Sequence, residues 1–288
     1  MKTFILILTM SFCCMTISAS TLGEHFSQLN SLSPHAPGSL NHKKVKDYII
    51  ASLKKSGADV RVQEFAYTNP YLGPQKGYNI IGVFKKGTTA LAFASHWDTR
   101  PVADREFASS DSKKPVFGAN DGNSSTAVLL ALADTIGARK KHTETIELYF
   151  FDAEDSGNSA DTFCIGSRYF VQHTPPSIRF GILLDMIGDN DLNIYYEGFS
   201  YQSVPVLTKK VWDTARSLGY MFFHQSVRHS IIDDHIPFLD KGIPFIDIID
   251  FDYPQWHTLD DTPANCSTAN MEKILHLMQT IVENSKNY

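Results

Sequence analysis

The sequence predicts a single globular α/β domain with a mixed, mostly parallel central sheet that helices flank on both faces. Apolar strand-like segments alternate with helical segments along the chain, which is typical of this class. Several apolar segments end in His, Asp or Glu, as expected where strands deliver polar side chains to one edge of an open sheet. No internal repeat, low-complexity tract or linker interrupts the 288 residues. We therefore expect one domain over residues 21–288.

The first third of the chain combines helices with strands. Residues 21–56 have apolar residues at helical spacing, with a break between Ser33 and Gly38, and Gly57 ends the run. Strands are expected at the alternating or apolar segments that follow, which are residues 60–67, 78–84 and 91–94. Residues 100–115 are polar and irregular, and they predict a loop.

The remaining elements alternate between the two types. Helices are expected over residues 126–136, 165–172, 204–218, 236–239 and 271–282. We expect a serine to cap the first of them. Strands are expected over residues 146–151, 181–186, 192–196 and 244–249.

Composition excludes several classes of partner. Hydrophobic residues make up 43% of the chain and charged residues 20%, which is ordinary for a folded globular protein. The net charge is -5, and Lys and Arg do not cluster. Nucleic acid and anionic membranes are therefore poor candidates. After residue 20 no apolar stretch is long enough to span a bilayer, so no membrane span is expected.

The first 20 residues predict a secretory signal peptide. Lys2 precedes an apolar run over residues 4–17, and Ser18-Ala19-Ser20 supplies small residues for cleavage. The run is too short for a membrane anchor. We expect the mature protein to be exported, to the periplasm or the medium.

Two cysteines remain after the leader, Cys164 and Cys266. An exported protein can form disulfides, and each cysteine follows a polar motif by about ten residues, so we favour one bridge between them. Two buried thiols are the alternative. Metal binding by this pair is not expected, because no other Cys or His lies nearby at zinc-finger spacing.

Acidic and imidazole residues at the ends of the apolar segments predict a zinc site. Zinc binds His nitrogen and carboxylate oxygen and keeps one position open in catalytic sites. Asp121, Asp155 and His257 can supply three ligands from three separate loops. Glu154 is adjacent to Asp155 and would point elsewhere, free to act as a general base or acid.

From about residue 40 to residue 270 the chain resembles the zinc exopeptidase family, which contains di-zinc aminopeptidases and glutaminyl-peptide cyclotransferases. The motifs that carry the resemblance are His96-Trp97-Asp98, Asn120-Asp121-Gly122-Asn123-Ser124, Glu154-Asp155, Asp185 and His257. The resemblance implies that Asp121, Asp155 and His257 bind zinc and that Glu154 shuttles protons. It also implies that Asp98 orients His96. Asp155 departs from the pattern, since a Glu is common there.

The two branches of this family differ in their metals. In the aminopeptidases the residues that correspond to His96 and Asp185 bind a second zinc, which shares Asp121. In the cyclotransferases one zinc suffices, and the residue matching Asp185 joins a hydrogen-bond network with the one matching Asp233. The hexapeptide at residues 233–238 and the Trp256-His257-Thr258 end resemble the cyclotransferases and favour that branch. Two metals remain an alternative.

The favoured resemblance implies conversion of N-terminal glutamine in peptides or proteins to pyroglutamate, with release of ammonia. Glu154 would transfer the proton, and Asp185 and Asp233 would hold the tetrahedral species. Trp256 and Tyr253 would form the walls of the substrate pocket. The alternatives are a secreted zinc aminopeptidase and a non-catalytic binding protein.

Other polar residues are expected to have simpler roles. Asp260 and Asp261 predict a solvated turn, and Arg100 and Arg105 are expected to pair with acids of their own loop.

Overall fold

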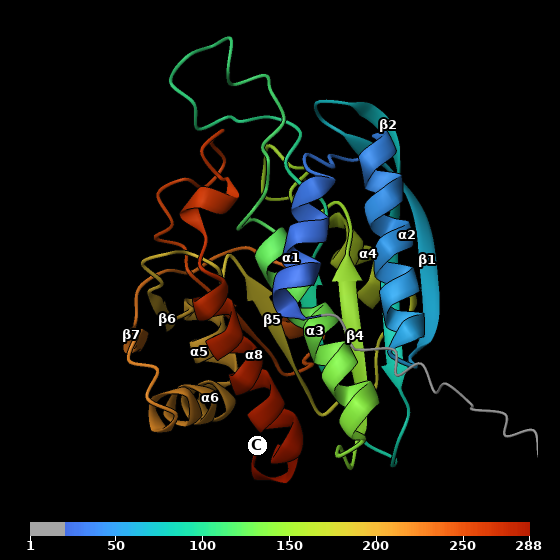
Figure 1. The fold of residues 1–288 in the computed structure, drawn as a ribbon, viewed down its shortest axis with the longest axis vertical. Coiled ribbons are helices and arrows are strands. Elements are labelled where there is room, and N and C mark those ends of the chain that lie inside the picture. The colour runs from blue at the N-terminus through green and yellow to red at the C-terminus, as the bar shows by residue number, and fades with distance from the viewer. Residues whose placement is uncertain (1–20) are drawn as a thin grey trace, which may run out of the picture.

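The computed structural model describes residues 21–288, and its centre is a six-stranded sheet in the order β1-β2-β4-β3-β5-β8 (Figure 1). The strands are β1 (Asp59–Asn69), β2 (Gly73–Phe84), β3 (Ala90–His96), β4 (Thr145–Phe151), β5 (Phe180–Asp185) and β8 (Phe245–Ile249). β4, β3, β5 and β8 are parallel, whereas β1 pairs with β2, and β2 with β4, in antiparallel fashion. The predicted mixed, mostly parallel sheet is confirmed.

Helices cover both faces of the sheet, as predicted. One face carries α1 (Leu22–Ser31), α2 (Leu40–Lys55), α3 (Asn123–Arg139) and α8 (Thr268–Glu283) (Figure 1). The other face carries α4 (Ile165–His173) and α7 (Ile236–Leu239). Successive residues of a strand point to opposite faces. Accordingly, Phe93 packs in the core on the face that carries α1, α2, α3 and α8, which we call the first core. Ala92 and Ala94 pack in the core on the face that carries α4 and α7, the second core.

The structure contains a small unit that the sequence predicted only in part: the strand at residues 192–196 and the helix at residues 204–218 were expected, whereas a second strand and a short helix were not. A two-stranded parallel sheet pairs β6 (Ile194–Tyr196) with β7 (Phe223–Val227), and α5 (Gly198–Ser203) precedes α6 (Pro205–Ser217). The six residues of α5 have no helical repeat of apolar side chains. The helix starts there because the Glu197 carboxylate accepts the backbone N–H groups of Phe199 and Ser200.

The predicted serine cap of α3 is wrong. The helix begins at Asn123 after Gly122, and no side chain caps it. Ser124 and Ser125 lie inside the first turn, where their hydroxyls donate back to the carbonyls of Asn120 and Gly122.

Residues 21–288 include no helix that is long and apolar enough to cross a membrane. The predicted signal peptide, residues 1–20, lies outside the described residues.

The fold brings distant polar residues to one edge of the sheet. Parallel strands present their carboxyl ends at the same edge, where ligands bind in open α/β sheets. His96 ends β3 and Asp185 ends β5. Glu154 and Asp155 follow the end of β4, and His257 follows β8.

Candidate active site

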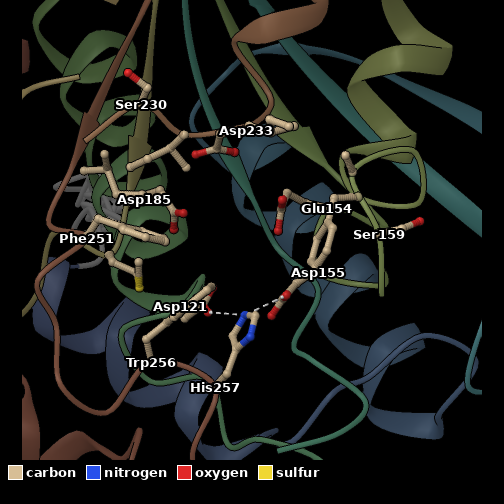
Figure 2. Close-up of a pocket in the computed structure, with 16 residues that line it drawn as sticks. Asp121, Glu154, Asp155, Ser159, Asp185, Ser230, Asp233, Phe251, Trp256 and His257 are labelled. Atoms are coloured by element: carbon tan, nitrogen blue, oxygen red, sulfur yellow. Dashed lines mark ion pairs between the residues drawn. The ribbon is translucent and has the colours of Figure 1, made fainter. Parts of the chain in front are cut away.

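Asp121, Asp155 and His257 lie together at this edge, as the sequence predicted (Figure 2). His257 Nε2 is 3.0 Å from Asp155 Oδ1 and 3.7 Å from Asp121 Oδ2. One potential ligand atom from each residue lies within 4.8 Å of the others, and all three side chains are buried. The group therefore has the spacing of a metal site.

This group fits a divalent cation such as zinc. Two carboxylates and one imidazole are common ligands of catalytic zinc. Oδ2 of Asp155 is buried and has no hydrogen-bond partner, which leaves a donor atom for an ion. Burial, together with the negative charge of Asp155, raises the pKa of Asp121 to about 6. A bound cation would relieve this repulsion.

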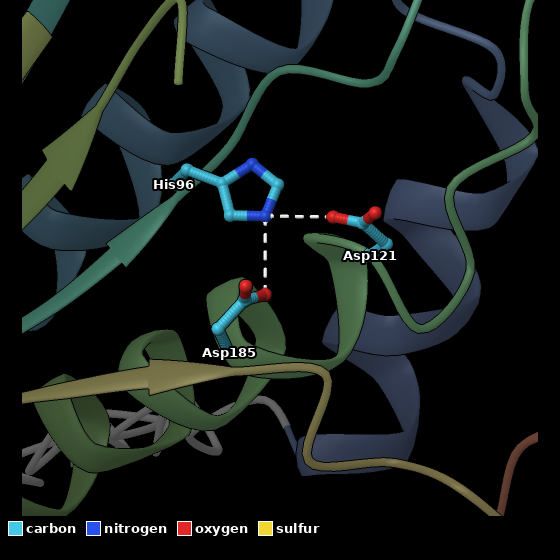
Figure 3. A group of neighbouring side chains, drawn as sticks. All are labelled: His96, Asp121 and Asp185. Atoms are coloured by element: carbon cyan, nitrogen blue, oxygen red, sulfur yellow. Dashed lines mark hydrogen bonds and ion pairs between the residues drawn. The ribbon is translucent and has the colours of Figure 1, made fainter. Parts of the chain in front are cut away.

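A second group shares Asp121 and adds His96 and Asp185 (Figure 3). His96 Nε2 lies 2.9 Å from Asp121 Oδ1 and 3.2 Å from Asp185 Oδ1. Burial alone would lower the pKa of His96, but the charge of Asp185 and hydrogen bonds to both carboxylates hold it well above its usual value. A Cβ on Gly122 would lie 2.6 Å from His96 Cε1, so this close approach requires glycine.

Asp98 links the strand-end loops beneath this group. Its Oδ1 lies 3.6 Å from His96 Nδ1 and accepts the backbone N–H of Glu154 at 3.2 Å. This placement suits a residue that orients His96.

A pocket of about 380 Å³ opens beside both groups. Figure 2 shows the Glu154 carboxylate between Asp233 and Asp155, with Asp185 and Asp121 across the pocket. The apolar residues that line it include Phe163, Met186, Ile231, Phe251 and Trp256. The pocket therefore combines an apolar wall with several closely spaced carboxylates, as substrate sites commonly do.

Two acids of this pocket, Asp233 and Glu154, hold their protons more tightly than free carboxyl groups do. Burial and the negative charge of Asp185 raise the pKa of Asp233 well above its usual value. Burial is also the main cause of the raised pKa of Glu154, and the charges of Asp233 and Asp155 add to it. A raised pKa suits a carboxyl group that takes a proton and gives it back during a reaction.

Tyr253 was predicted to form a wall of the substrate pocket, but it is not among the described residues that line this pocket. Its hydroxyl donates instead to Asp261 Oδ1 at 2.9 Å. Asp261 is fully buried, and its carboxylate accepts the backbone N–H groups of Asn120 at 2.8 Å and Asp121 at 3.2 Å. The expectation of a solvated turn was therefore wrong for Asp261, which holds the turn that carries Asp121.

The predicted disulfide is also wrong, because Cys164 and Cys266 are both free. The Cys164 thiol is buried and donates to Glu154 Oε1 at 3.3 Å. Cys266 lies just before α8, where its thiol faces the carbonyl of Thr262 at 3.7 Å. Each cysteine follows a site motif by about ten residues, but this equal spacing did not bring the two thiols together. The loops that follow the two motifs run in different directions.

Comparison with known proteins agrees with this geometry. Residues 79–282 match peptidase family M28. The glutaminyl-peptide cyclotransferase of Drosophila melanogaster is 29% identical over 279 residues, which cover 85% of this chain and 76% of that protein.

Two solved structures are similar over nearly their whole length. The glutaminyl cyclase of Tannerella forsythia is 33% identical with a TM-score of 0.86, covering 93% of this chain and 99% of the other. A leucine aminopeptidase precursor from Bacteroides thetaiotaomicron is 29% identical with a TM-score of 0.88, covering 93% and 97%. On its sequence match and its fold, the chain belongs to peptidase family M28.

Proposed function

We propose that this chain is a glutaminyl-peptide cyclotransferase, which converts the N-terminal glutamine of peptides to pyroglutamate and releases ammonia. The observation that carries the proposal is the position of Glu154 in the pocket, beside the Asp121, Asp155 and His257 group (Figure 2). The similarity to the Tannerella forsythia glutaminyl cyclase supports it.

In this proposal Asp121, Asp155 and His257 hold one zinc ion. When bound, zinc would supply a Lewis acid that polarises the side-chain amide carbonyl of the substrate. We call these three residues the metal group. Glu154 is left free for proton transfer, because its neighbour Asp155 belongs to the metal group and would bind the zinc.

The reaction needs a base that also acts as an acid. The substrate α-amine attacks the carbonyl carbon of its own side chain, a C–N bond forms, and the original bond to the amide nitrogen breaks. Glu154 takes one proton from the attacking amine and gives it to the departing ammonia, so no water is consumed. The raised pKa of Glu154 suits this exchange.

Asp185 and Asp233 lie on the pocket wall and would stabilise the tetrahedral species by hydrogen bonds. Two buried acids at such close quarters cannot both ionise easily, and the raised pKa of Asp233 keeps a donor proton available. Trp256 and Phe251 would enclose the aliphatic part of the glutamine side chain.

The test is incubation with a peptide that begins with glutamine. Ammonia release and a product lighter by one ammonia would support the proposal. The same peptide beginning with leucine is the control and should remain unchanged. Residues 1–20 further suggest export of the mature chain, which fractionation of expressing cells would test.

A zinc aminopeptidase is the second candidate, and the group of His96, Asp121 and Asp185 is the observation that favours it. An aminopeptidase must activate water against a backbone amide. Hydrolysis of a leucine anilide without cyclisation of the glutamine peptide, together with two zinc ions per chain, would replace the first proposal with this one.

A further inference from the structure

Arg100 is fully buried beside the metal group, although it lies in a polar loop. Only 1% of its side chain is exposed. Its Nη1 donates to Asp155 Oδ1 at 2.9 Å and to the Asp155 carbonyl at 3.1 Å, and its Nη2 donates to the Gly157 carbonyl at 3.1 Å. Arg100 therefore occupies one carboxylate oxygen of Asp155, and the other oxygen, Oδ2, is the one without a partner.

Asp104 makes the matching contact with the histidine of the group. Its Oδ1 lies 3.3 Å from Nδ1 of His257. A carboxylate at Nδ1 keeps the proton there and directs Nε2 toward a metal. Nε2 of His257 does face Asp155 and Asp121 (Figure 2).

Arg100 and Asp104 also bind each other. Arg100 Nε donates to Asp104 Oδ1 at 2.8 Å, and Nη2 donates to Oδ2 at 2.6 Å. This two-point contact requires the planar fork of a guanidinium, which a lysine lacks. This contact links the residue that holds Asp155 to the residue that holds His257. Asp155 and His257 themselves lie 102 positions apart in the chain.

We propose that Arg100 and Asp104 are a positioning pair for the metal group. Arg100 leaves Oδ2 of Asp155 as the free donor atom, and Asp104 fixes His257 with Nε2 toward the cation. The inference rests on the proposed zinc site, but it does not depend on cyclisation.

The charges explain why the two residues occur together. A lone guanidinium so close to the ligands would repel a divalent cation. Asp104 neutralises that charge at hydrogen-bond distance. The pair therefore orients Asp155 and His257 with little electrostatic cost to cation binding.

The loop that carries the pair also contacts the His257 segment at other points. The Arg105 N–H donates to the His257 carbonyl at 3.2 Å, and its guanidinium lies 4.6 Å from the centre of the Trp256 ring. Glu106 Oε1 accepts the Leu259 N–H at 2.7 Å. The pair thus connects the metal group to a loop that also positions a pocket wall.

The test is the zinc affinity of Asp104→Asn and Arg100→Lys, measured by competition with a chelating dye. We expect each variant to bind zinc about 10- to 100-fold more weakly than the wild type. Asp104→Asn preserves shape but loses the charge at His257. Arg100→Lys preserves the positive charge but loses the planar guanidinium. It therefore separates the orientation of the Asp155 carboxylate from the effect of charge on zinc binding.

Two matched controls should bind zinc with unchanged affinity. Asp111→Asn changes an acid of the same loop whose only ion pair among residues 21–288 is with Lys114, at 2.6 Å. Arg179→Lys changes an arginine that holds Glu144 at 2.8 Å, away from the metal group. The visible spectrum of the cobalt-substituted protein gives a second readout, which should change in Asp104→Asn and not in Asp111→Asn.

Wild-type zinc affinity in both test variants would overturn the inference. So would a lower melting temperature of the metal-free variants with unchanged affinity, since the pair would then only brace the loop. A wild-type chain that binds no zinc would overturn both this inference and the proposed metal site. Weaker zinc binding in the variants of a chain that cyclises no glutamine peptide would refute the proposed function and leave the positioning pair standing.

Discussion

Replacing Glu154 with glutamine tests the proposed mechanism most directly. The two side chains have nearly the same shape, and glutamine can still accept the hydrogen bond from the Cys164 thiol. Glutamine cannot accept a proton from the substrate amine. Loss of a general base typically lowers the rate by about 10²- to 10⁴-fold. That corresponds to about 3–5 kcal/mol of transition-state stabilisation.

The same substitution should leave the fold intact. Burial raises the pKa of Glu154 in the folded chain, so the metal-free folded state holds this proton more tightly than the unfolded state. The stability contribution of this group is present at low pH and is lost as pH rises through the folded pKa. Glutamine does not titrate. Metal-free Glu154→Gln should therefore lose less stability than the wild type between pH 5 and about 8.

The assay combines ammonia release from a glutamine peptide, zinc content and the melting temperature at both pH values. We expect kcat to fall, zinc content to stay the same and the melting temperature at alkaline pH to be no lower. A variant with wild-type kcat would remove Glu154 from the chemistry. A variant that has lost its zinc would show that Glu154 serves the metal group instead.

Four further predictions follow from the same structure. Removal of metal with a chelator should abolish cyclisation, and added zinc should restore it. Asp261→Ala should destabilise the fold by about 3 kcal/mol or more, from three lost hydrogen bonds at roughly 1 kcal/mol each, and weaken zinc binding, as urea unfolding and dye competition would show. Trp256→Ala should raise KM about tenfold with little change in kcat, because about 1.4 kcal/mol of lost apolar contact is one decade in binding. Phe238→Ala should cost about 3–5 kcal/mol in urea unfolding, because its fully buried ring packs against other aromatic rings of the second core.

The sequence predicted the sheet and its helices because their apolar patterns are local. β4 is apolar from Leu148 to Phe151 and β5 from Phe180 to Leu184, as strand segments buried on both faces require. The unit of β6, β7 and α5 was incompletely predicted, because these short elements depend on tertiary contacts such as the Glu197 cap.

The predicted ligands come together because each lies at or just beyond the end of a parallel strand, or at the start of α3. The supporting residues were harder to find. Asp104 and Asp261 lie in irregular segments, where spacing along the chain does not reveal side-chain direction. The same limitation explains the wrong disulfide and the misplaced Tyr253. The hydrogen bonds of Asp261 join segments more than 100 residues apart, and no local sequence pattern encodes such contacts.

The order of the ligands along the chain has a consequence for biosynthesis. Asp121 and Asp155 are made more than 100 residues before His257. A nascent chain therefore lacks the third residue of this group until synthesis has reached residue 257. An ion that needs all three residues would therefore stabilise the fold only after His257 has been made, and it would not guide the folding of the earlier segments.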